Sequence, residues 1–349
     1  MSEIVKLTRL SHGGGCGCKI APAVLERLLS DLPKSALAFP DLLVGIENGD
    51  DAAVYRIGNG MALVATTDFF MPIVDDPVDF GRIAATNALS DIYAMGAKPI
   101  LALALLAMPL DKLPDHVIRD IVRGGHMACE AAGIPLAGGH SIDSVEPIYG
   151  LVALGLVEEA KIKRNDSAKA GDILILGKPL GIGILSAALK KGELSARGYQ
   201  AMIDLTTRLN SVGMSLGELD GVHAMTDVTG FGLLGHCFEI CRGSGLSARI
   251  DFAAVPLISE TRQHAINGIV TGASGRNWSS YGAEIALEPG ILDWQKNLLT
   301  DPQTSGGLLV ACAQDSVSDI LSRFHAEGFA DAAVIGKLEA GKAGISVSM

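Results

Sequence analysis

The chain has 349 residues, of which 48% are hydrophobic and 19% are charged, and its formal net charge is −11. This length and composition predict two domains with sizeable cores and exclude an intrinsically disordered chain. The acidic balance argues against nonspecific binding to nucleic acid, which requires a cationic surface. The longest apolar stretch, residues 100–108, is about half of what a membrane helix needs, so we expect no membrane-spanning segment.

The N-terminal sequence has neither a long apolar core nor a small-residue cleavage site. We therefore expect no secretory signal and a cytoplasmic location. Six cysteines are ordinary usage for this length, and without export their thiols should stay reduced.

The first half of the chain shows helical and extended patterns in alternation. Gly96 and Gly133 follow the ends of two long apolar-periodic segments, as glycines commonly do at helix C-termini. Helices are predicted at residues 20–32, 79–95 and 116–132, and strands at residues 42–44, 53–57, 62–67, 99–107, 134–137 and 148–157.

The most charged run, residues 158–167, divides the chain near its middle. We interpret it as a domain linker, with a solvated surface loop as the alternative. The predicted organisation is an arm with a short helix over residues 1–45, an N-terminal domain over residues 46–160 and a C-terminal domain over residues 168–349.

The second half restarts with a strand and again mixes both kinds of element, which indicates an α+β or α/β fold. Strands are predicted at residues 172–176, 222–225, 246–250, 306–312 and 333–335, and helices after a glycine turn at residues 181–183 and at residues 201–216, 231–241 and 317–324.

Residues 12–19, His-Gly-Gly-Gly-Cys-Gly-Cys-Lys, are the most informative segment. Three consecutive glycines leave the backbone free to move and to approach a ligand closely. Cys16, Cys18 and Lys19 then place two thiols and an ammonium within four residues. We expect this flexible arm to bring them to a ligand. A frayed terminus, or half of a zinc site, is the alternative.

Four aspartates recur beside small or β-branched residues. Each alone is explained as a cap or a turn former, but Asp91 lies inside a predicted helix, on the same face as Asn87, where it caps nothing. Carboxylates without cationic partners repel each other, and Mg²⁺ resolves that repulsion while binding phosphate oxygens. We therefore predict a Mg²⁺–nucleotide site built from Asp51, Asp68, Asp91 and Asp227.

The remaining motifs are less specific. Residues 137–143 form either a tight turn or an anion-binding loop, and residues 301–307 form a proline-directed turn. The chain has neither a P-loop nor a protein-kinase signature. Cys237 and Cys241, four apart on a predicted helix, could complete a four-sulfur zinc site with the arm, but buried small hydrophobic residues are the favoured interpretation.

Together these segments resemble the selenophosphate synthetase (selenide, water dikinase) family, within the aminoimidazole ribonucleotide synthetase-like superfamily. Some members carry selenocysteine at the first thiol position, where this chain has Cys16. The matching pieces follow the family's order over nearly the whole chain: residues 12–19, 49–55, 66–70, 85–96, 137–143, 224–235 and 301–309.

The resemblance implies an α+β fold of two domains, in which strands of the N-terminal domain pair with a second subunit to form a homodimer. It implies a reaction in which ATP, selenide and water give selenophosphate, AMP and orthophosphate, with selenophosphate as the selenium donor for selenocysteine and selenonucleoside synthesis. Mg²⁺ and a monovalent cation such as K⁺ are the implied cofactors. A selenium-delivery protein is a further implied partner.

The resemblance also implies roles for single residues. Cys16 is the catalytic thiol, which either carries selenium or shapes the closed arm, and Lys19 is required beside it. The implied Mg²⁺ ligands are Asp51, Asp91 and Asp227. The implied ATP contacts are Lys19, Asn48, Gly49, Asp50, Asp68 and Asp91, with Gly139, His140 and Ser141 from the neighbouring subunit.

The residues of the arm give one further expectation, about the charge of Cys16, and two alternative functions remain open. Lys19 should favour the thiolate form of Cys16. A thiamine-phosphate kinase-like enzyme of the same superfamily would share the acidic motifs, but we would not expect it to carry the thiol arm. A noncatalytic thiol-based carrier of selenium or metal would use Cys16 and Cys18 but would not need the aspartates.

Overall fold

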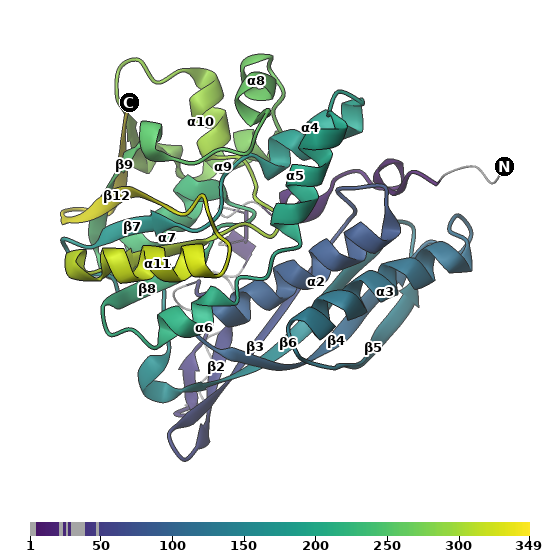
Figure 1. Ribbon diagram of the computed structural model, residues 1–349, viewed down its shortest axis with the longest axis horizontal. Helices are drawn as coiled ribbons and strands as arrows, with labels where there is room; N and C mark the ends of the chain where they lie inside the picture. The colour runs from purple at the N-terminus through teal and green to yellow at the C-terminus, as the bar shows by residue number, and fades with distance from the viewer. Residues whose placement is uncertain (1–4, 21–23, 26, 29–38, 47–48) are drawn as a thin grey trace.

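Two mixed β-sheets, one from each half of the chain, organise the structure (Figure 1). The computed structural model describes residues 5–20, 24–25, 27–28, 39–46 and 49–349. Most of the predicted helix at residues 20–32, and Asn48, lie outside the described residues. Within the described part, no helix is long and apolar enough to cross a membrane.

The first sheet has six strands in the order β1-β2-β3-β6-β4-β5, antiparallel except for the parallel pair of β4 and β5. Alternating small and branched residues in β3 place Ala62 and Val64 against the core. The strands are β1 (Leu42–Val44), β2 (Ala53–Gly58), β3 (Met61–Phe70), β4 (Lys98–Met108), β5 (Leu136–Asp143) and β6 (Ile148–Glu158).

Helices α2 (Pro77–Ala94) and α3 (Asp115–Ala131) lie together on one face of this sheet (Figure 1). Asp76 caps α2 by accepting a hydrogen bond from Asp79 N. Helix α3 buries one apolar face, whereas α2 is buried on nearly all sides, because helices of the second half cover it as well. Residues of α2 therefore lie where the two halves meet.

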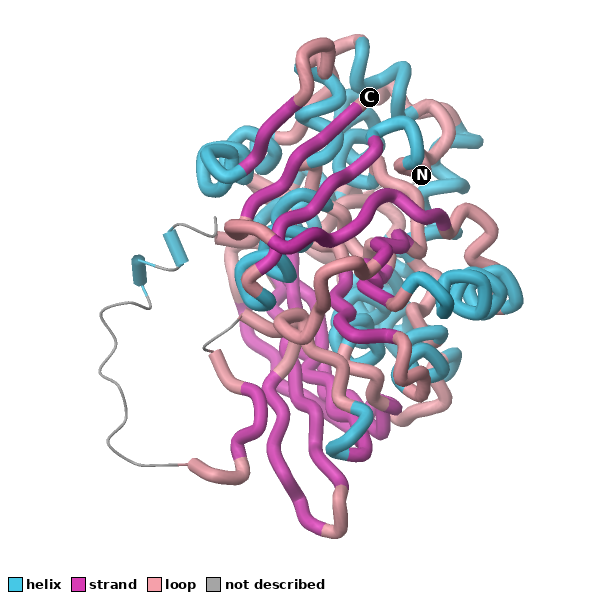
Figure 2. Tube along the Cα trace, turned by 90° about the vertical axis from the view of Figure 1, so that its left-hand side faces the viewer, coloured by secondary structure: helices cyan, strands magenta, loops and turns pink. Residues whose placement is uncertain are grey.

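The second sheet has seven strands in the order β10-β13-β9-β12-β7-β11-β8, and Figure 2 shows it above the first. Helix α7 packs on one of its faces, and α6 and α11 pack on the other. The strands are β7 (Ile173–Leu176), β8 (Val222–Asp227), β9 (Leu246–Asp251), β10 (Ile285–Leu287), β11 (Leu308–Cys312), β12 (Ala333–Ala340) and β13 (Gly344–Ser348).

The two halves are joined by shared packing as well as by the chain. Leu185 of α4 and Met202 of α5 belong to the same apolar cluster as the core of α2. The helices of the second half are α4 (Ile182–Lys191), α5 (Ala196–Thr206), α6 (Val212–Gly217), α7 (Gly232–Ser244), α8 (Thr261–Ile266), α9 (Gly272–Tyr281), α10 (Asp293–Leu299) and α11 (Val317–Ala326).

The charged run at residues 158–167 is packed rather than fully solvated. Lys163 is 8% exposed, and its Nζ donates to Leu219 O and Val222 O, each at 2.9 Å. Asn165 is wholly buried. The alternative of a solvated surface loop is therefore wrong, because Lys163 binds backbone atoms of the second half and Asn165 binds Gly49 and Asp50 of the first.

The predicted α+β class is confirmed, and most predicted elements occur within two residues of their expected ends. The helix predicted at residues 201–216 is wrong: it is interrupted between α5 and α6, where Asn210 turns its side chain onto Gly306 O. Residues 137–143 are no tight turn, because they continue β5 in register with β4. Strands β10 and β13 and helices α8 to α10 were not predicted.

Helices α2 and α3 pack closely because a glycine of α2 lies at their contact, so replacing it should lower stability. A methyl group at Gly81 would overlap Ile121 O of α3. We expect Gly81→Ala to lower the free energy of unfolding by about 1–3 kcal/mol. In the exposed helix α9, Gly275 has open space around it, so Gly275→Ala should raise stability by up to about 1 kcal/mol. Urea unfolding measures both, and equal effects would contradict the close packing.

Candidate functional site

Three aspartates bring their carboxylates together where the two halves of the chain meet. Asp51 lies in the loop before β2, Asp91 lies in α2, and Asp227 ends β8. Their oxygens lie within 4.8 Å of one another. Among the described residues, no other group of three acidic, histidine or cysteine side chains is this close. The structure thus brings together the three residues predicted to hold Mg²⁺.

Threonines orient two of these carboxylates. Thr226 Oγ1 donates to Asp51 Oδ1 at 2.7 Å, and Thr66 Oγ1 donates to Asp91 Oδ2 at 2.6 Å. Within the described part of the chain, the buried Oδ2 atoms of Asp51 and Asp227 have no hydrogen-bond partner. Orphaned carboxylate oxygens in such a group fit a hard divalent cation such as Mg²⁺, which takes oxygen ligands.

Without a cation, the ionised form of this cluster is unfavourable. Burial is the larger cause, and repulsion among the carboxylates is the smaller one. Burial raises the pKa of Asp51 and of Asp91 well above the usual carboxyl range, and the charge of Asp227 raises both further. Burial also raises the pKa of Asp227, although a hydrogen bond from Ser90 opposes that rise. A bound cation would reverse this preference and favour the ionised carboxylates.

Asp68 is held apart from this trio by partners of its own. Lys19 Nζ lies 2.8 Å from Asp68 Oδ2, and Asn87 Nδ2 donates to the same oxygen at 2.7 Å. The residue pattern alone grouped Asp68 with the other three aspartates, but the structure pairs it with the ammonium of the arm. Burial has the largest single effect on Lys19 and opposes its charge, but Asp68, Cys16 and Asp91 together outweigh it, so the pKa of Lys19 is raised.

The glycine-rich arm is folded onto the site. Its residues Gly15–Cys18 form a 3₁₀ turn, η2, and the Cys16 side chain is 1% exposed. Cys16 N donates to Thr304 Oγ1 at 2.9 Å, and Cys16 Sγ donates to Asn87 Oδ1 at 3.2 Å. Gly15 adopts φ 54°, in the left-handed region that favours glycine. The alternative of a frayed terminus is therefore wrong for this segment.

Lys19 favours the thiolate of Cys16, as expected, but burial outweighs this effect in the docked arm. Burial raises the pKa of Cys16 far above that of a free thiol, and although Lys19 lowers it, burial has the larger effect. Cys16 therefore carries its proton and donates it to Asn87. Cys18 is half-buried, and burial raises its pKa to about 11.

Two other predicted nucleotide contacts, Gly49 and Asp50, are hydrogen-bonded to residues 158–167, the connector between the two halves of the chain. Asn165 N donates to Asp50 Oδ1 at 2.8 Å, and Asn165 Nδ2 donates to Gly49 O at 3.0 Å. Arg164 Nε lies 3.7 Å from Asp50 Oδ2. The structure therefore turns Asp50 toward the connector, while its neighbour Asp51 joins the carboxylate cluster.

Gly139, His140 and Ser141 lie far along the first sheet from the cluster. They belong to β5, its outer strand, and β4 and β6 separate β5 from β3, which carries Asp68. All three are exposed. A side chain at Gly139 would overlap Ala104 O of β4, so glycine is required for this pairing. The structure does not bring these residues to the cluster of the same chain.

Sequence reasoning missed several supporting residues. Asn87 was placed on the face of Asp91 but given no role, and it bridges Asp68 and Cys16. Thr304 and Ser305 were taken as part of a turn, yet Thr304 binds the arm and Ser305 N donates to Asn87 Oδ1 at 2.7 Å. The only sequence signal for Thr304 and Ser305 was weak, because they belong to a short polar run directly before the buried strand β11.

The four remaining cysteines are buried within apolar clusters, which confirms their interpretation as small hydrophobic residues. Cys237 and Cys241 pack in the core of α7. The described residues contain no cluster of cysteines that could bind a metal. The predicted alternative of a four-sulfur zinc site is therefore wrong for the described chain.

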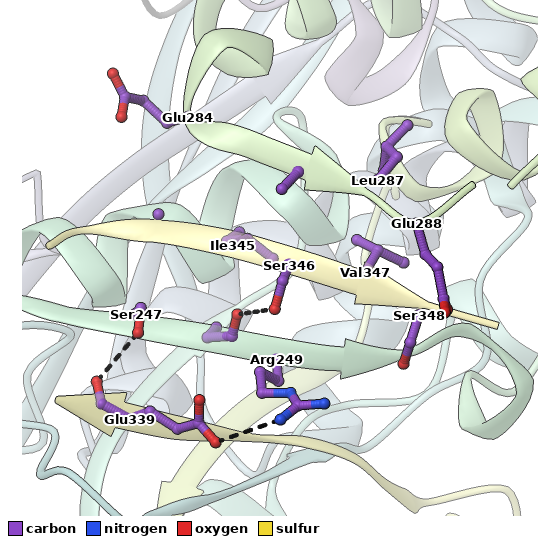
Figure 3. A pocket seen from close by; sticks show the side chains of 13 residues that line it. Ser247, Arg249, Glu284, Leu287, Glu288, Glu339, Ile345, Ser346, Val347 and Ser348 are labelled. Atoms are coloured by element: carbon purple, nitrogen blue, oxygen red, sulfur yellow. Dashed lines mark hydrogen bonds and ion pairs between the residues drawn. The ribbon is translucent and has the colours of Figure 1, made fainter. Parts of the chain in front are cut away.

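The surface of the described chain includes two grooves of similar size. One, of about 680 Å³, runs over β9, β10, β12 and β13 and is lined by serines and the pair of Arg249 and Glu339, 3.9 Å apart (Figure 3). It contains none of the cluster's residues. The other, of about 630 Å³, is lined on one side by the arm, including Cys18 and Lys19. The second groove therefore adjoins the site.

Comparison with protein families matches both halves of the chain. Residues 49–157 match the family described as AIR synthase related protein, N-terminal domain. Residues 169–348 match AIR synthase related protein, C-terminal domain. The chain is 65% identical to the selenide, water dikinase of Pseudomonas straminea, over 96% of this chain and 94% of that protein. It is 62% identical to that of Burkholderia pseudomallei, over 98% and 97%.

Solved structures share the fold at lower identity. A thiamine-monophosphate kinase from Stenotrophomonas maltophilia aligns with a TM-score of 0.63 and 22% identity, over 93% of this chain and 96% of that one. The hydrogenase maturation protein HypE from E. coli aligns with a TM-score of 0.65 and 19% identity, over 93% of each chain. At these identities the likeness shows the architecture alone.

The raised carboxyl pKa values give a prediction for the metal-free protein. Protonated carboxyls stabilise the fold below the unfolded pKa of about 4, and this stability is lost as the pH rises toward the raised folded values. Without metal, Asp227→Asn should therefore melt roughly 2–5 °C above the unmodified protein near pH 8, and the difference should shrink toward pH 4.

Mg²⁺ without nucleotide should raise the melting temperature of the unmodified protein more at pH 8 than at pH 5, because the ionised cluster binds it. Calorimetry measures both effects. Asp111→Asn removes one exposed carboxylate and is the matched control, which should keep the Mg²⁺ shift. A Mg²⁺ shift that survives in Asp227→Asn would remove Asp227 from the metal site.

Proposed function

The chain belongs to the selenide, water dikinase family of AIR synthase related proteins, and we propose that Asp51, Asp91 and Asp227 hold the Mg²⁺ with which it makes selenophosphate from ATP, selenide and water. AMP and orthophosphate are the other products. One observation carries the assignment of the site: the carboxylate cluster, the Lys19–Asp68 pair and the Cys16 thiol converge around α2.

The cluster suits phosphoryl transfer because this chemistry requires positioning and charge neutralisation rather than covalent help from the protein. Bound Mg²⁺ supplies positive charge to phosphate oxygens. Thr66 and Thr226 keep two of the carboxylates in place. An acidic protein can in this way accept a triphosphate.

Lys19 supplies a second positive charge, and Asp68 sets its position. The 2.8 Å pair holds the ammonium beside the cluster, and we propose that a triphosphate takes over part of this pairing. Asp50 and Gly49 are proposed nucleotide contacts as well, and their place between the cluster and the connector supports this assignment. Asn48, outside the described residues, is proposed from the sequence alone.

Closure of the arm excludes water from the reacting phosphate, which must meet selenide before solvent. Cys16 lies at the buried end of the closed arm with its thiol protonated and bound to Asn87. This arrangement favours Cys16 as an element of the closed loop. The role of selenium carrier requires the arm to lift and the thiol to lose its proton. Water must afterwards cleave the remaining nucleoside diphosphate to give AMP.

We also propose a homodimer in which Gly139, His140 and Ser141 contact the nucleotide of a second subunit. Their exposure on an outer strand supports this, as do the apolar side chains of Phe69 and Ile142, 51% and 56% exposed on the same sheet. A monovalent cation such as K⁺, a selenium-delivery protein and a cytoplasmic location remain predictions of the sequence.

The two arm thiols should differ in function. Cys16→Ser should abolish selenide-dependent AMP formation, because serine does not reproduce the chemistry or the fit of the buried thiol. Cys18→Ser should stay within about twofold of the unmodified enzyme, because Cys18 faces the outer groove. Phosphorus NMR detects selenophosphate, and chromatography quantifies AMP. Equal losses in both variants would indicate a paired-thiol role instead.

Loss of one cluster carboxylate should be severe. Asp51→Asn should lower AMP formation on the order of a hundredfold or more, because one ligand of the proposed metal is lost. Asp111→Asn makes the same charge change at an exposed site and should leave the rate unchanged. Both are measured at saturating Mg²⁺ and ATP. Unmodified activity in Asp51→Asn would show that this carboxylate is no metal ligand.

A further inference from the structure

A buried lysine outside the proposed site binds the loop on which the arm rests. Lys178 follows β7 and is 1% exposed. Its Nζ donates to Ser305 O at 2.9 Å and to Arg208 O at 2.8 Å. Burial lowers the pKa of Lys178 to about 7, so an ammonium here is costly. The mechanism described above makes no use of it.

The loop that Lys178 binds, residues 301–307, has a strained backbone at Ser305, and three successive carbonyls in it accept hydrogen bonds. Ser305 has φ 54°, in the left-handed region that a residue with a side chain rarely adopts. Asn210 Nδ2 donates to Gly306 O, and Val228 N donates to Gly307 O, both at 2.9 Å. The three carbonyls in succession therefore have fixed donors, and the donor to Ser305 O is Lys178 Nζ.

The same loop contacts the arm directly. Thr304 Oγ1 accepts the hydrogen bond from Cys16 N, and Ser305 N donates to Asn87 Oδ1, the oxygen that also accepts the Cys16 thiol. A shift of Ser305 would therefore disturb both contacts of Cys16. From Lys178 to Cys16 the path is a continuous series of hydrogen bonds.

We propose that Lys178 is a positioning residue whose Nζ fixes Ser305 and thereby presents Thr304 and Asn87 to the docked arm. Its two hydrogen bonds, which both the amine and the ammonium can donate, oppose the strain at Ser305. The kinetic consequence rests on the proposed function. Docking of the arm is a property of the fold and is tested separately.

A second buried lysine provides a matched control. Lys163 also donates to two backbone carbonyls, Leu219 O and Val222 O at 2.9 Å. It lies in the connector and, within the described part of the chain, forms no hydrogen bond or ion pair with the arm or with residues 301–307. Lys178→Met and Lys163→Met both replace a buried ammonium with an apolar chain of similar length. They should destabilise the fold comparably.

The experiment measures alkylation of single cysteines by iodoacetamide, resolved by peptide mass spectrometry on the intact, unliganded chain. In Lys178→Met the alkylation rate of Cys16 should rise about tenfold or more, while buried Cys237 and Cys312 stay protected. In Lys163→Met, Cys16 should react as in the unmodified protein. In turnover, Lys178→Met should lower kcat about tenfold with the KM for ATP within about twofold.

The proposal is overturned if Cys16 stays protected in Lys178→Met, if Lys163→Met exposes it equally, or if Cys237 becomes reactive with it, because the lysine would then act on the fold as a whole. An unchanged kcat beside an exposed Cys16 would overturn the catalytic part. Absence of selenophosphate with the unmodified enzyme would instead refute the proposed function, and alkylation would still decide the role of Lys178.

Discussion

The fold brings three carboxylates together at one place, and their mutual repulsion is the constraint on which the candidate site depends. Asp51, Asp91 and Asp227 come from a loop, a helix and a strand end, and none forms a salt bridge to lysine or arginine in the described chain. The ammonium of Lys19, in the arm beside the cluster, pairs with Asp68 instead. Such an arrangement is unfavourable for folding alone. A cation and a polyanion would offset this repulsion, which supports the proposed ligand site where the two halves of the chain meet.

The same site explains why the arm needs both its glycines and its fixed support. Gly15 adopts a left-handed conformation, and a side chain on Gly14 would come within 2.6 Å of Pro72 O. Only a glycine backbone can pass this closely and still bury Cys16 against Asn87 and Thr304. Flexibility therefore serves the approach of the arm, while its docked position is determined by buried polar groups of both domains.

Sequence patterns predicted the framework well where periodicity was strong, as in α2, α3 and the long strands of the first sheet. They failed where tertiary contacts override local signals. Asn210 ends α5 by bonding to a distant carbonyl, and Gly139 continues an edge strand although glycine suggested a turn. In the site, the aspartates could be anticipated from their unusual places. The roles of Asn87 and Ser305 depend on contacts between residues 218 positions apart, which no local pattern encodes.

His12 is bound to Glu146 at 2.9 Å, and in the described chain residues 15–19 of the arm make few further polar contacts, which bears on how substrates reach the site. Gly15 N donates to Met71 O, Gly17 O accepts from Arg276, Cys16 makes two hydrogen bonds, and Lys19 pairs with Asp68. At on the order of 1 kcal/mol net for each, lifting the arm costs a few kcal/mol, far less than unfolding a domain. A nucleotide that recruits Lys19 from Asp68 would alter that balance directly. Under the proposed function, the pair of Lys19 and Asp68 would link nucleotide binding to the position of Cys16, since only Gly17 and Cys18 separate the two residues.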